Sequence, residues 1–297
     1  MEYEGILKIK PHTLKKYNIL RKYLHVCKVF NDKYHNFVYV DTHGGSGRVS
    51  LEGKTDEYLD GSPLIVAHYD DTWPCHICEI DPQTYKALEE SVCECENVRT
   101  YFGDSNDIIH EILGTIERGK KFVLFYVDPS ALIYTGSDGA SCDQVRAGTI
   151  KAITEFPRTE LLLNFPLMSI LRCAGDFFSN PHEPRAISNG DRVSTFMGSE
   201  SWKELTVRNR TPRDYLEVFI EEMLESYNFV GAYLVRSTEK NLPLYYLVYC
   251  THNFTGAKIM RDIMNKEDDF PIHYSFDLGR FPTFDEMYPL GQFIFEK

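Results

Sequence analysis

The sequence predicts an α/β fold with a mostly parallel seven-stranded sheet, helices on both faces and an antiparallel last strand. First, short apolar segments alternate five times with helical patterns, which is typical of a parallel sheet covered by helices. Second, two strand-like segments joined by a short polar loop follow, and this pair would add the antiparallel strand. Third, 297 residues, 43% of them hydrophobic, are sufficient to bury a core without disulfide bonds.

The expected elements follow one another in a regular order. The strands are expected at 37–41, 75–80, 98–102, 122–127 and 160–165, and the closing pair at 231–237 and 244–250. The first helix is expected at about 13–27, where apolar residues recur at helical spacing. Three more helices are predicted where a capping residue precedes a proline. A short one begins at Ser62, the one capped by Asp81 covers 83–90, and the one that begins at Thr211 runs to about 227. Further helices are expected from Asp104 or Ser105, over 144–155, and from Thr255 to Met264.

The domain organisation predicted from this order is a single domain over residues 1–297. The stretch at about 172–214 differs from its surroundings, because it is polar and carries Pro, Gly and Asn residues that interrupt regular structure. We interpret it as an insertion at the edge of the sheet where the strands end, and not as a second domain. The sequence shows no internal repeat or low-complexity segment.

The charge balance argues against a protein that binds duplex nucleic acid over its whole surface. The chain has 32 Lys and Arg against 44 Asp and Glu, a net charge of −12, whereas phosphate binding needs clustered cations. A local basic stretch, Lys203 to Arg213 with Trp202 beside it, could meet nucleic acid, although a solvated face is the favoured interpretation. No apolar run has the length of a membrane span and the first residues lack a secretory pattern, so we expect a cytoplasmic protein without membrane contact.

The eight cysteines suggest two alternatives. Cys75, Cys78, Cys93 and Cys95 lie close enough in sequence for a four-thiolate zinc site. The favoured interpretation is free thiols, with Cys75 and Cys78 on a buried strand, because cysteine is among the most buried residue types. We therefore assign no metal ligand.

Polar residues stand where five of the expected strands end. They are Asp41, Glu79, Asp104, Asp128 and Asn164. In open α/β sheets, ligands bind outside the carboxyl ends of the strands. Each residue alone could simply begin a turn, but five at one edge of the sheet indicate a binding site.

The segment Asp41-Thr-His-Gly-Gly-Ser-Gly47 is the candidate cofactor turn. Its glycines would let a ligand approach the backbone, but the spacing does not complete G-x-G-x-x-G, and Arg48 stands where a phosphate-binding loop needs Lys. S-adenosylmethionine fits better than a dinucleotide, since it has no pyrophosphate. Asp41 could meet its ammonium group, and His43, Gly45 and Gly47 could contact the rest. The alternative is a plain tight turn.

Three further residues complete the expected cofactor site. Glu79 could accept hydrogen bonds from both ribose hydroxyls. Asp104 could accept one from the adenine amino group, with Ser105 beside it, although a helix cap is an equally good interpretation of Asp104.

The expected catalytic residues follow the fourth and fifth strands. Asp128, held by Pro129, could accept a proton from a nucleophilic nitrogen or oxygen, and Asn164 could supply a second polar contact. The alternative is that both residues only begin turns. A magnesium site made of the strand-end carboxylates is disfavoured, because neighbouring strands lie about 4.8 Å apart and would spread the ligands.

Seven motifs in order along the chain resemble those of the three-Cys-motif partner proteins. They are Thr13–Leu24, Tyr39–Gly47, Gly61–Ala67, Phe125–Pro129, Leu162–Pro166, Phe196–Gly198 with Trp202, and Leu244–Leu247. The resemblance implies a Rossmann-like fold similar to that of S-adenosylmethionine-dependent methyltransferases, and a phage-associated three-cysteine protein as partner. It does not imply a substrate.

The chain departs from such proteins at two places. His43 and Gly44 replace an aromatic residue and alanine of the family, and Ser130 and Ala131 replace the second proline and the aromatic residue of amino-methylating enzymes. Protein, RNA and small-molecule acceptors therefore stay open. Two functions remain: a methyltransferase acting on nitrogen or oxygen, or a methyltransferase-like module that binds its partner without catalysis, in a phage-associated or DNA-processing system.

Overall fold

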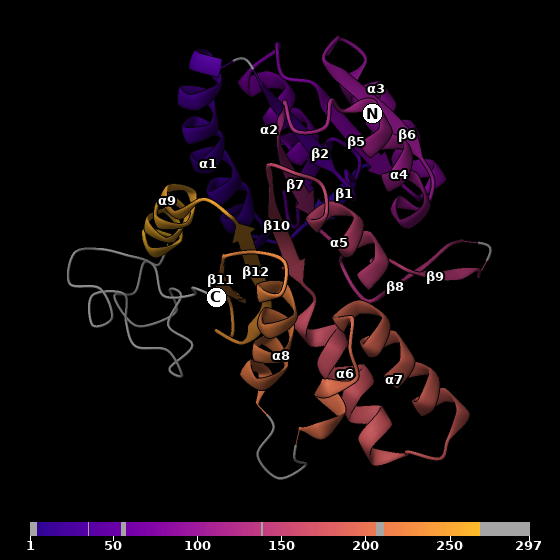
Figure 1. Cartoon of the computed structure of the whole chain (residues 1–297). Coiled ribbons are helices and arrows are strands. Elements are labelled where there is room, and N and C mark those ends of the chain that lie inside the picture. Colours follow the sequence, from indigo (N-terminus) through magenta and orange to yellow (C-terminus); the bar gives the residue numbers. More distant parts are fainter. Residues whose placement is uncertain (1–4, 35, 55–57, 138, 206–210, 268–297) are drawn as a thin grey trace.

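The main sheet of the computed structural model has seven strands in the order β11-β12-β10-β7-β2-β5-β6 (Figure 1). The structure describes residues 5–34, 36–54, 58–137, 139–205 and 211–267. The strands are β2 (Phe37–Asp41), β5 (Cys75–Glu79), β6 (Val98–Phe102), β7 (Phe122–Val127), β10 (Thr159–Phe165), β11 (Phe229–Arg236) and β12 (Pro243–Thr251). Strand β12 is antiparallel to both of its neighbours and the other pairs are parallel. The prediction of a mostly parallel sheet with an antiparallel last strand is confirmed, and that strand inserts between β10 and β11.

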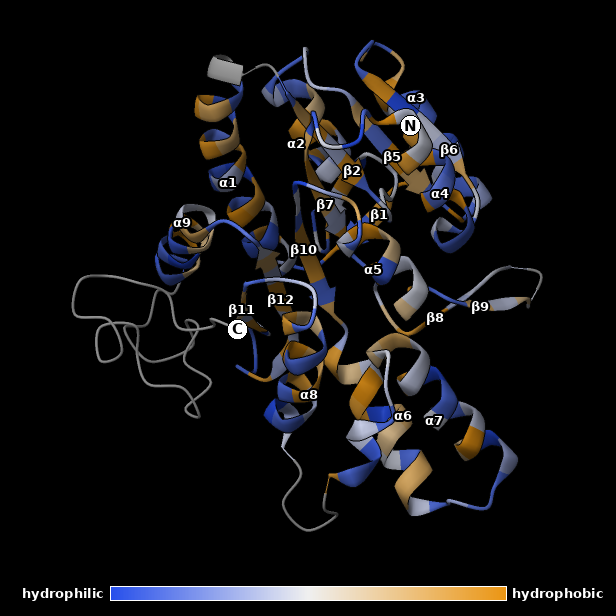
Figure 2. Cartoon of the chain, in the orientation of Figure 1, coloured by the Kyte–Doolittle hydropathy of each residue, from blue (hydrophilic) through white to orange (hydrophobic). Residues whose placement is uncertain are grey.

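Helices cover both faces of the sheet, as the alternation predicts. Contacts link α1 (Thr13–Tyr34), α2 (Ser62–Tyr69), α3 (Pro82–Val92) and α9 (Phe254–Asn265) into one row. A second row contains α4 (Ser105–Thr115), α5 (Ala147–Thr154) and α8 (Pro212–Leu224). Figure 2 shows that the helices combine hydrophobic and hydrophilic faces. The apolar faces are therefore free to pack on the sheet, which is the usual arrangement for surface helices.

Some helix ends differ from the prediction. Helix α1 runs on to Tyr34, because residues 28–34 contain no Gly or Pro to end it. Helix α2 is capped by Gly61 instead of Ser62, and α9 by the side chain of Asn253 instead of Thr255. Helix α5 begins at Ala147, since the side chain of Asn106 accepts the backbone N–H of Arg146 just before it.

Five short strands escape the sequence prediction. Strands β1 (Leu7–Ile9), β3 (Arg48–Leu51) and β4 (Tyr58–Asp60) form a small second sheet, and β8 (Ile133–Thr135) pairs with β9 (Ser141–Asp143). Segments of three or four residues are too short to show a period of two. The small sheet matters for function, because β1 crosses over the glycine turn that follows β2: a Cβ on Gly45 would lie 3.0 Å from a methyl group of Leu7.

Much of the stretch predicted as a polar insertion, at about 172–214, is helical in the structure. The stretch that begins within α6 (Leu167–Ser179) continues as α7 (Pro184–Met197), and the two helices contact each other as a hairpin (Figure 1). Gly190 allows this close approach, because a Cβ there would lie 2.5 Å from the ring of Phe177. Polar residues on the outer faces of the hairpin hide this structure from a search for apolar runs.

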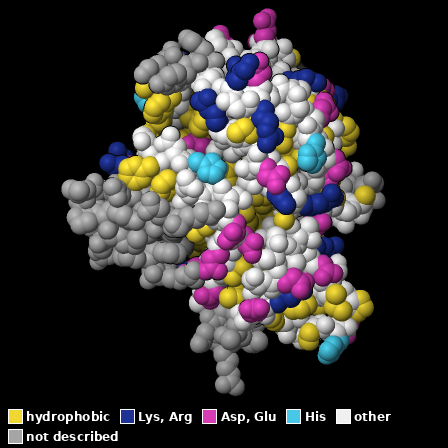
Figure 3. Space-filling model, viewed as in Figure 1, with side chains coloured by type: hydrophobic (Ala, Val, Ile, Leu, Met, Phe, Trp, Pro, Cys, Tyr) yellow, Lys and Arg dark blue, Asp and Glu magenta, His cyan; other side chains and the backbone are white. Residues whose placement is uncertain are grey.

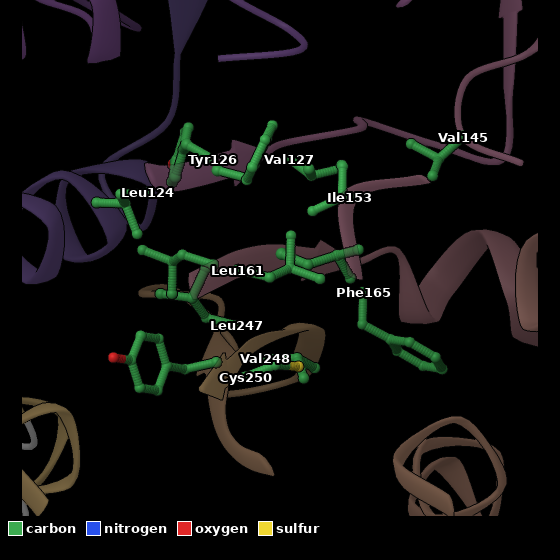
Figure 4. Packing of buried hydrophobic residues seen from close by; sticks show 14 of the residues in the cluster. Leu124, Tyr126, Val127, Val145, Ile153, Leu161, Phe165, Leu247, Val248 and Cys250 are labelled. Atoms are coloured by element: carbon green, nitrogen blue, oxygen red, sulfur yellow. The ribbon is translucent and has the colours of Figure 1, made fainter. Parts of the chain in front are cut away.

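The core lies between the sheet and the two helix rows. Strands β7 and β10 are at its centre, and nearly all their side chains are buried. Figure 4 shows Leu124, Tyr126 and Leu161 among them, with Leu247 from β12 close by. The parallel register of β7 and β10 pairs Val127 with Leu163. Asp128 and Asn164 come next in each segment, so they lie side by side at the edge of this core.

Candidate functional site

A cavity of about 640 Å³ opens at the carboxyl ends of the parallel strands. The small second sheet and the start of α1 form one wall, and the strand ends form the other. Of the residues expected to form the site, seven line the cavity: His43, Gly45, Glu79, Asp104, Ser105, Asp128 and Asn164. The structure thus brings together most of the predicted set, which comes from five separate parts of the chain.

Asp41, Gly47 and Pro129 are not among the lining residues. The Asp41 carboxylate is fully buried, accepting the backbone N–H of His43 at 3.0 Å and the Tyr39 hydroxyl at 3.2 Å. Burial raises the pKa of Asp41 to about 7, although hydrogen bonds from Ser62 and His43 oppose the shift. Asp41 therefore holds the shape of the glycine turn from beneath, in place of the expected position at the cofactor's ammonium group.

The glycine turn itself is tightly packed. A Cβ on Gly44 would lie 2.3 Å from the side chain of Ile77, and Gly45 has a φ of +62°, which favours glycine. The Gly47 carbonyl accepts the N–H of Gly61 at 2.7 Å, an approach that leaves no room for a side chain on Gly61. Gly45 thus presents backbone to the cavity, while Gly47 serves the packing behind it.

Glu79 is the best-placed acid for a ribose. Its Oε1 accepts the backbone N–H groups of Ile80 and Asp81, both at 2.8 Å, and its Oε2 accepts that of Gly45 at 2.9 Å. A carboxylate has about four lone-pair positions, so one on Oε2 remains for a ligand hydroxyl. Burial raises the pKa of Glu79, while the three N–H groups act in the opposite direction.

Asp104 combines both roles that the sequence suggests. It caps α4 by accepting the N–H of Asn106 at 2.9 Å, and Arg146 approaches its other oxygen at 3.4 Å. It also lines the cavity together with Ser105, which is buried. The Asp104 carboxylate is therefore held rigidly at the end of β6.

Asp128 and Asn164 form the polar pair at the other end of the cavity. The Asn164 amide donates to Asp128 Oδ1 and to the Pro129 carbonyl, each at 3.0 Å. The ammonium group of Lys16 forms an ion pair with Asp128 Oδ2, and the two side chains are only 12% and 11% exposed. Asn164 Oδ1 is buried and has no partner among the described residues. Since buried acceptors are normally satisfied, this oxygen indicates a missing donor.

Lys16 is the site residue that sequence reasoning missed. It comes from the first turns of α1, 112 residues away from Asp128. Burial raises the pKa values of Tyr17, Tyr126 and Tyr245, and the charge of Asp128 raises them further. The hydroxyls of Tyr126 and Tyr245 are buried without a partner in the described part of the chain.

Both ring nitrogens of His43 have partners within the protein. Its ring nitrogens contact the Thr42 hydroxyl at 2.8 Å and the Gln144 carbonyl at 3.2 Å. Burial lowers the pKa of His43 to about 4, so the ring is neutral near pH 7. A neutral ring whose Nε2–H donates to the carbonyl satisfies both contacts. The ring thereby ties the glycine turn to the segment that precedes α5.

Cys75 and Cys78 lie on buried β5, as favoured from the sequence, and Cys93 is exposed. The Cys75 thiol donates to the Trp73 carbonyl at 3.3 Å. Within the ranges that the structure describes, no group of three or more His, Cys, Asp or Glu side chains could hold a metal ion. In the same ranges no helix is long and apolar enough to span a bilayer.

Trp202, the aromatic residue of the stretch that could meet nucleic acid, is not on the surface. Trp202 is fully buried, its indole N–H donates to Ser194 at 3.0 Å, and its ring packs edge-on against Phe177 and Phe178. It is therefore not available to stack on a base. Arg208 and Arg210 lie outside the described residues.

No family model and no curated protein matches this chain. Among solved structures, it is similar to protein LPL1258 of Legionella pneumophila strain Philadelphia 1, of the family model DUF519, with a TM-score of 0.51 and 14% identity over 91% of this chain and 95% of that one. It is also similar to a putative O-methyltransferase of Klebsiella pneumoniae (TM-score 0.42, 10% identity, 79% and 80% covered). A third is the O-methyltransferase TomG of Streptomyces achromogenes, involved in tomaymycin synthesis and solved with S-adenosylmethionine (TM-score 0.40, 10% identity, 80% of each chain).

At these identities the likeness concerns the fold. The strand order and the similarity to LPL1258 define the class of structure: a Rossmann-like α/β fold with a seven-stranded, mostly parallel sheet in which β12 is antiparallel. This confirms the fold expected from the sequence. Membership of the three-Cys-motif partner family is not shown by these comparisons.

The residues present fit an adenosyl cofactor. The cavity volume lies within the range of about 300–1,000 Å³ that is usual for ligand sites. Glu79 Oε2, which has a free lone pair, and the backbone of Gly45 line the wall of the cavity, and Asn164, whose Oδ1 has no partner among the described residues, lines its other end.

Proposed function

We propose that this protein is an S-adenosylmethionine-dependent methyltransferase that acts on a nitrogen or oxygen atom of its acceptor. The observation that carries the proposal is a single cavity that joins Glu79 at one end to the Asp128–Asn164 pair at the other. The first could hold a nucleoside, and the second could receive a nucleophile.

Glu79 Oε2 would accept a ribose hydroxyl, and Gly45 would allow close approach of the ligand to the backbone. Asp104 and Ser105 would lie beside the adenine. Asp41 and His43 would act as positioning residues, since each is bonded within the turn that forms the cofactor wall.

The acceptor would bind at Asp128 and Asn164. The cofactor, when bound, would supply a methyl group from its sulfonium sulfur, with a neutral thioether as the leaving group. Asp128 and the free Oδ1 of Asn164 would orient the nucleophile by accepting its N–H or O–H. Asp128 would also receive the proton that the nucleophile loses, and Lys16 would hold the carboxylate in place through their ion pair.

Calorimetry with S-adenosylmethionine and S-adenosylhomocysteine tests the cofactor half. We expect affinities in the micromolar range for the wild type and a loss of at least about tenfold in Glu79→Gln, because the carboxylate loses its charge and one of its two acceptor oxygens becomes an NH2 donor. Glu90→Gln, an exposed position on α3, is the matched control. The absence of binding of either ligand to folded wild-type protein would reject the proposal.

The second candidate is a methyltransferase-like module that binds a three-Cys-motif protein without catalysis. The ion pair between Lys16 and Asp128 favours it, because the acid that would act on an acceptor already has a partner. This candidate predicts a co-purifying three-cysteine protein and no methyl transfer, even when the cofactor is bound.

A further inference from the structure

We propose that the acceptor carries a phosphate-type anion, which binds to the basic wall formed by Lys8, Lys10 and His12 at the edge of the cavity. This inference rests on the proposed function and adds the chemical class of the substrate. The three residues belong to β1 and to the turn that leads into α1, and all three line the cavity that contains Asp128.

The backbone directs the two lysines the same way. Lys8 and Lys10 stand two residues apart on and just after β1, and alternate residues of a strand share a face. Between them Ile9 is 9% exposed and packs into the core, whereas both lysines are exposed. The pairing of β1 with β3 fixes this register, because Ile9 is aligned with Leu51.

The acids of the cavity are already engaged, and these lysines are not. Glu79 accepts three backbone N–H groups, Asp81 accepts Thr84 and Tyr134, and Asp104 and Asp128 pair with Arg146 and Lys16. Among the residues described, neither Lys8 nor Lys10 forms an ion pair. Two unpaired ammonium groups therefore stand at the edge of a cavity in which Asp104 and Asp128 are each paired with another cation.

His12 adds a further donor beside the lysines. The His12 ring lies 6.2 Å from the ring of Tyr245, whose buried hydroxyl has no partner among the described residues. Burial and the charges of Lys10 and Lys16 lower the pKa of His12, so the ring offers one N–H donor as a neutral group. Ammonium groups with neutral donors beside them suit a multiply charged anion with several oxygens, and lysine commonly binds phosphate as a point charge.

The remainder of the chain makes this wall distinctive. A net charge of −12 repels anions from most of the surface, so a cavity with free cations would concentrate them locally. Figure 3 shows that charge is unevenly distributed on the face it displays: Lys and Arg side chains gather in its upper part, and Asp and Glu around its middle.

A ³¹P NMR titration tests the inference, with inorganic phosphate and glycerol 3-phosphate as probes. The variants are Lys8→Gln/Lys10→Gln and the control Lys86→Gln/Lys258→Gln, which removes the same charge from exposed positions on α3 and α9. We expect saturable binding to the wild type and the control. In the basic-wall variant the affinity should fall by about fivefold or more, from the loss of two partly exposed charge contacts. Added salt should weaken the binding.

Binding of S-adenosylhomocysteine by the same proteins separates this inference from the proposed function. Equal cofactor affinity in all three proteins, with phosphate affinity lost only in the basic-wall variant, supports the inference. Lack of saturable phosphate binding, or an equal loss in the control, overturns it. A parallel loss of cofactor affinity in the basic-wall variant also overturns it, because the lysines would then bind the cofactor's carboxylate. Phosphate binding without any cofactor binding would instead reject the methyltransferase proposal.

Discussion

Helix α1 contacts a carboxylate at each end of the central strands: Glu160 at the amino end of β10, and Asp128 just beyond the carboxyl end of β7. The two ends differ in how their polar groups are satisfied. At the amino end, Glu160 is 3% exposed and accepts the hydroxyls of Tyr23 and, at 2.8 Å, Thr251. Tyr23 and Tyr249 share a further hydrogen bond of 2.6 Å. A smaller cavity of about 280 Å³ beside Glu160 is lined by no unpartnered buried polar atom of the described residues.

At the carboxyl end, Asp128 has Lys16 and Asn164 as partners, but Asn164 Oδ1 and the Tyr126 hydroxyl have none. Burial of polar groups is costly, and it is tolerated when each group has a partner. The satisfied end is therefore expected to serve stability, and the unsatisfied end to serve a ligand. The same helix contributes to both, since Lys16 and Tyr23 are two turns apart on α1.

The largest effect is expected for Asp128→Asn. The amide cannot accept a proton, so methyl transfer from radiolabelled S-adenosylmethionine into acceptors of a cell extract should fall by about 10²-fold or more. The affinity for S-adenosylhomocysteine should not change. Asp71→Asn, at an exposed position, is the control and should keep full activity. Unaltered transfer by the Asp128 variant would show that the carboxyl end is not catalytic.

The pH dependence of stability should reveal Asp41, which lies at the same end of the sheet as Asp128. Its folded-state pKa, about 7, lies above the ordinary value of 3.8, so the native state binds a proton that the unfolded state has released. This contribution to stability is complete below pH 4 and is lost as the pH rises to 7. Its full size is on the order of 4 kcal/mol. Urea unfolding between pH 4 and 8 should show this decline in the wild type and a weaker one in Asp41→Asn. Parallel curves for the two proteins would contradict the assignment.

Glu160→Ala should lower the free energy of unfolding without changing the affinity for the cofactor. The hydroxyls of Tyr23 and Thr251 would lose their acceptor in a buried position, which costs about 1–3 kcal/mol for each unsatisfied group. Chemical denaturation measures the loss, and Glu155→Ala, whose side chain is 65% exposed, provides the control. A loss of cofactor affinity with unchanged stability would reverse the roles given to the two ends.

Much of the main sheet could be predicted from the sequence. The bounds expected for β2, β6 and β7 are those observed. β2 and β7 are apolar runs, whereas β6 contains Arg99 and Thr100 and ends at the turn that begins with Gly103. The neighbourhood of Asp128 and Asn164 followed from two strands that end in polar residues, and the hydrogen bond between them confirms it. Local patterns were sufficient wherever the relevant contact lies within one repeated strand–helix unit.

Features that depend on contacts between residues far apart in the sequence could not be predicted. Lys16 follows another lysine on a helix, and nothing local indicates which of the two turns towards Asp128. Trp202 stands among basic residues, but its burial depends on Phe177 and Phe178 from another helix. Strand β1 has three residues and exists because it pairs with β3, about 40 residues further on. Whether a strand-end acid faces the cavity, as Glu79 does, or lies beneath it, as Asp41 does, was likewise decided by such packing.

The smallest effects come from a matched pair of hydroxyl deletions. Tyr23→Phe removes a buried hydroxyl bonded to Glu160 and Tyr249, so it should lower the free energy of unfolding by about 1 kcal/mol or more. Tyr126→Phe removes an equally buried hydroxyl with no partner in the described part of the chain, so stability should change by less than about 0.5 kcal/mol. Denaturation midpoints of the two variants, measured side by side without ligand, give the comparison. If Tyr126→Phe costs as much as Tyr23→Phe, then its hydroxyl is satisfied in the folded protein, and the distinction between the two ends of the sheet fails at that residue.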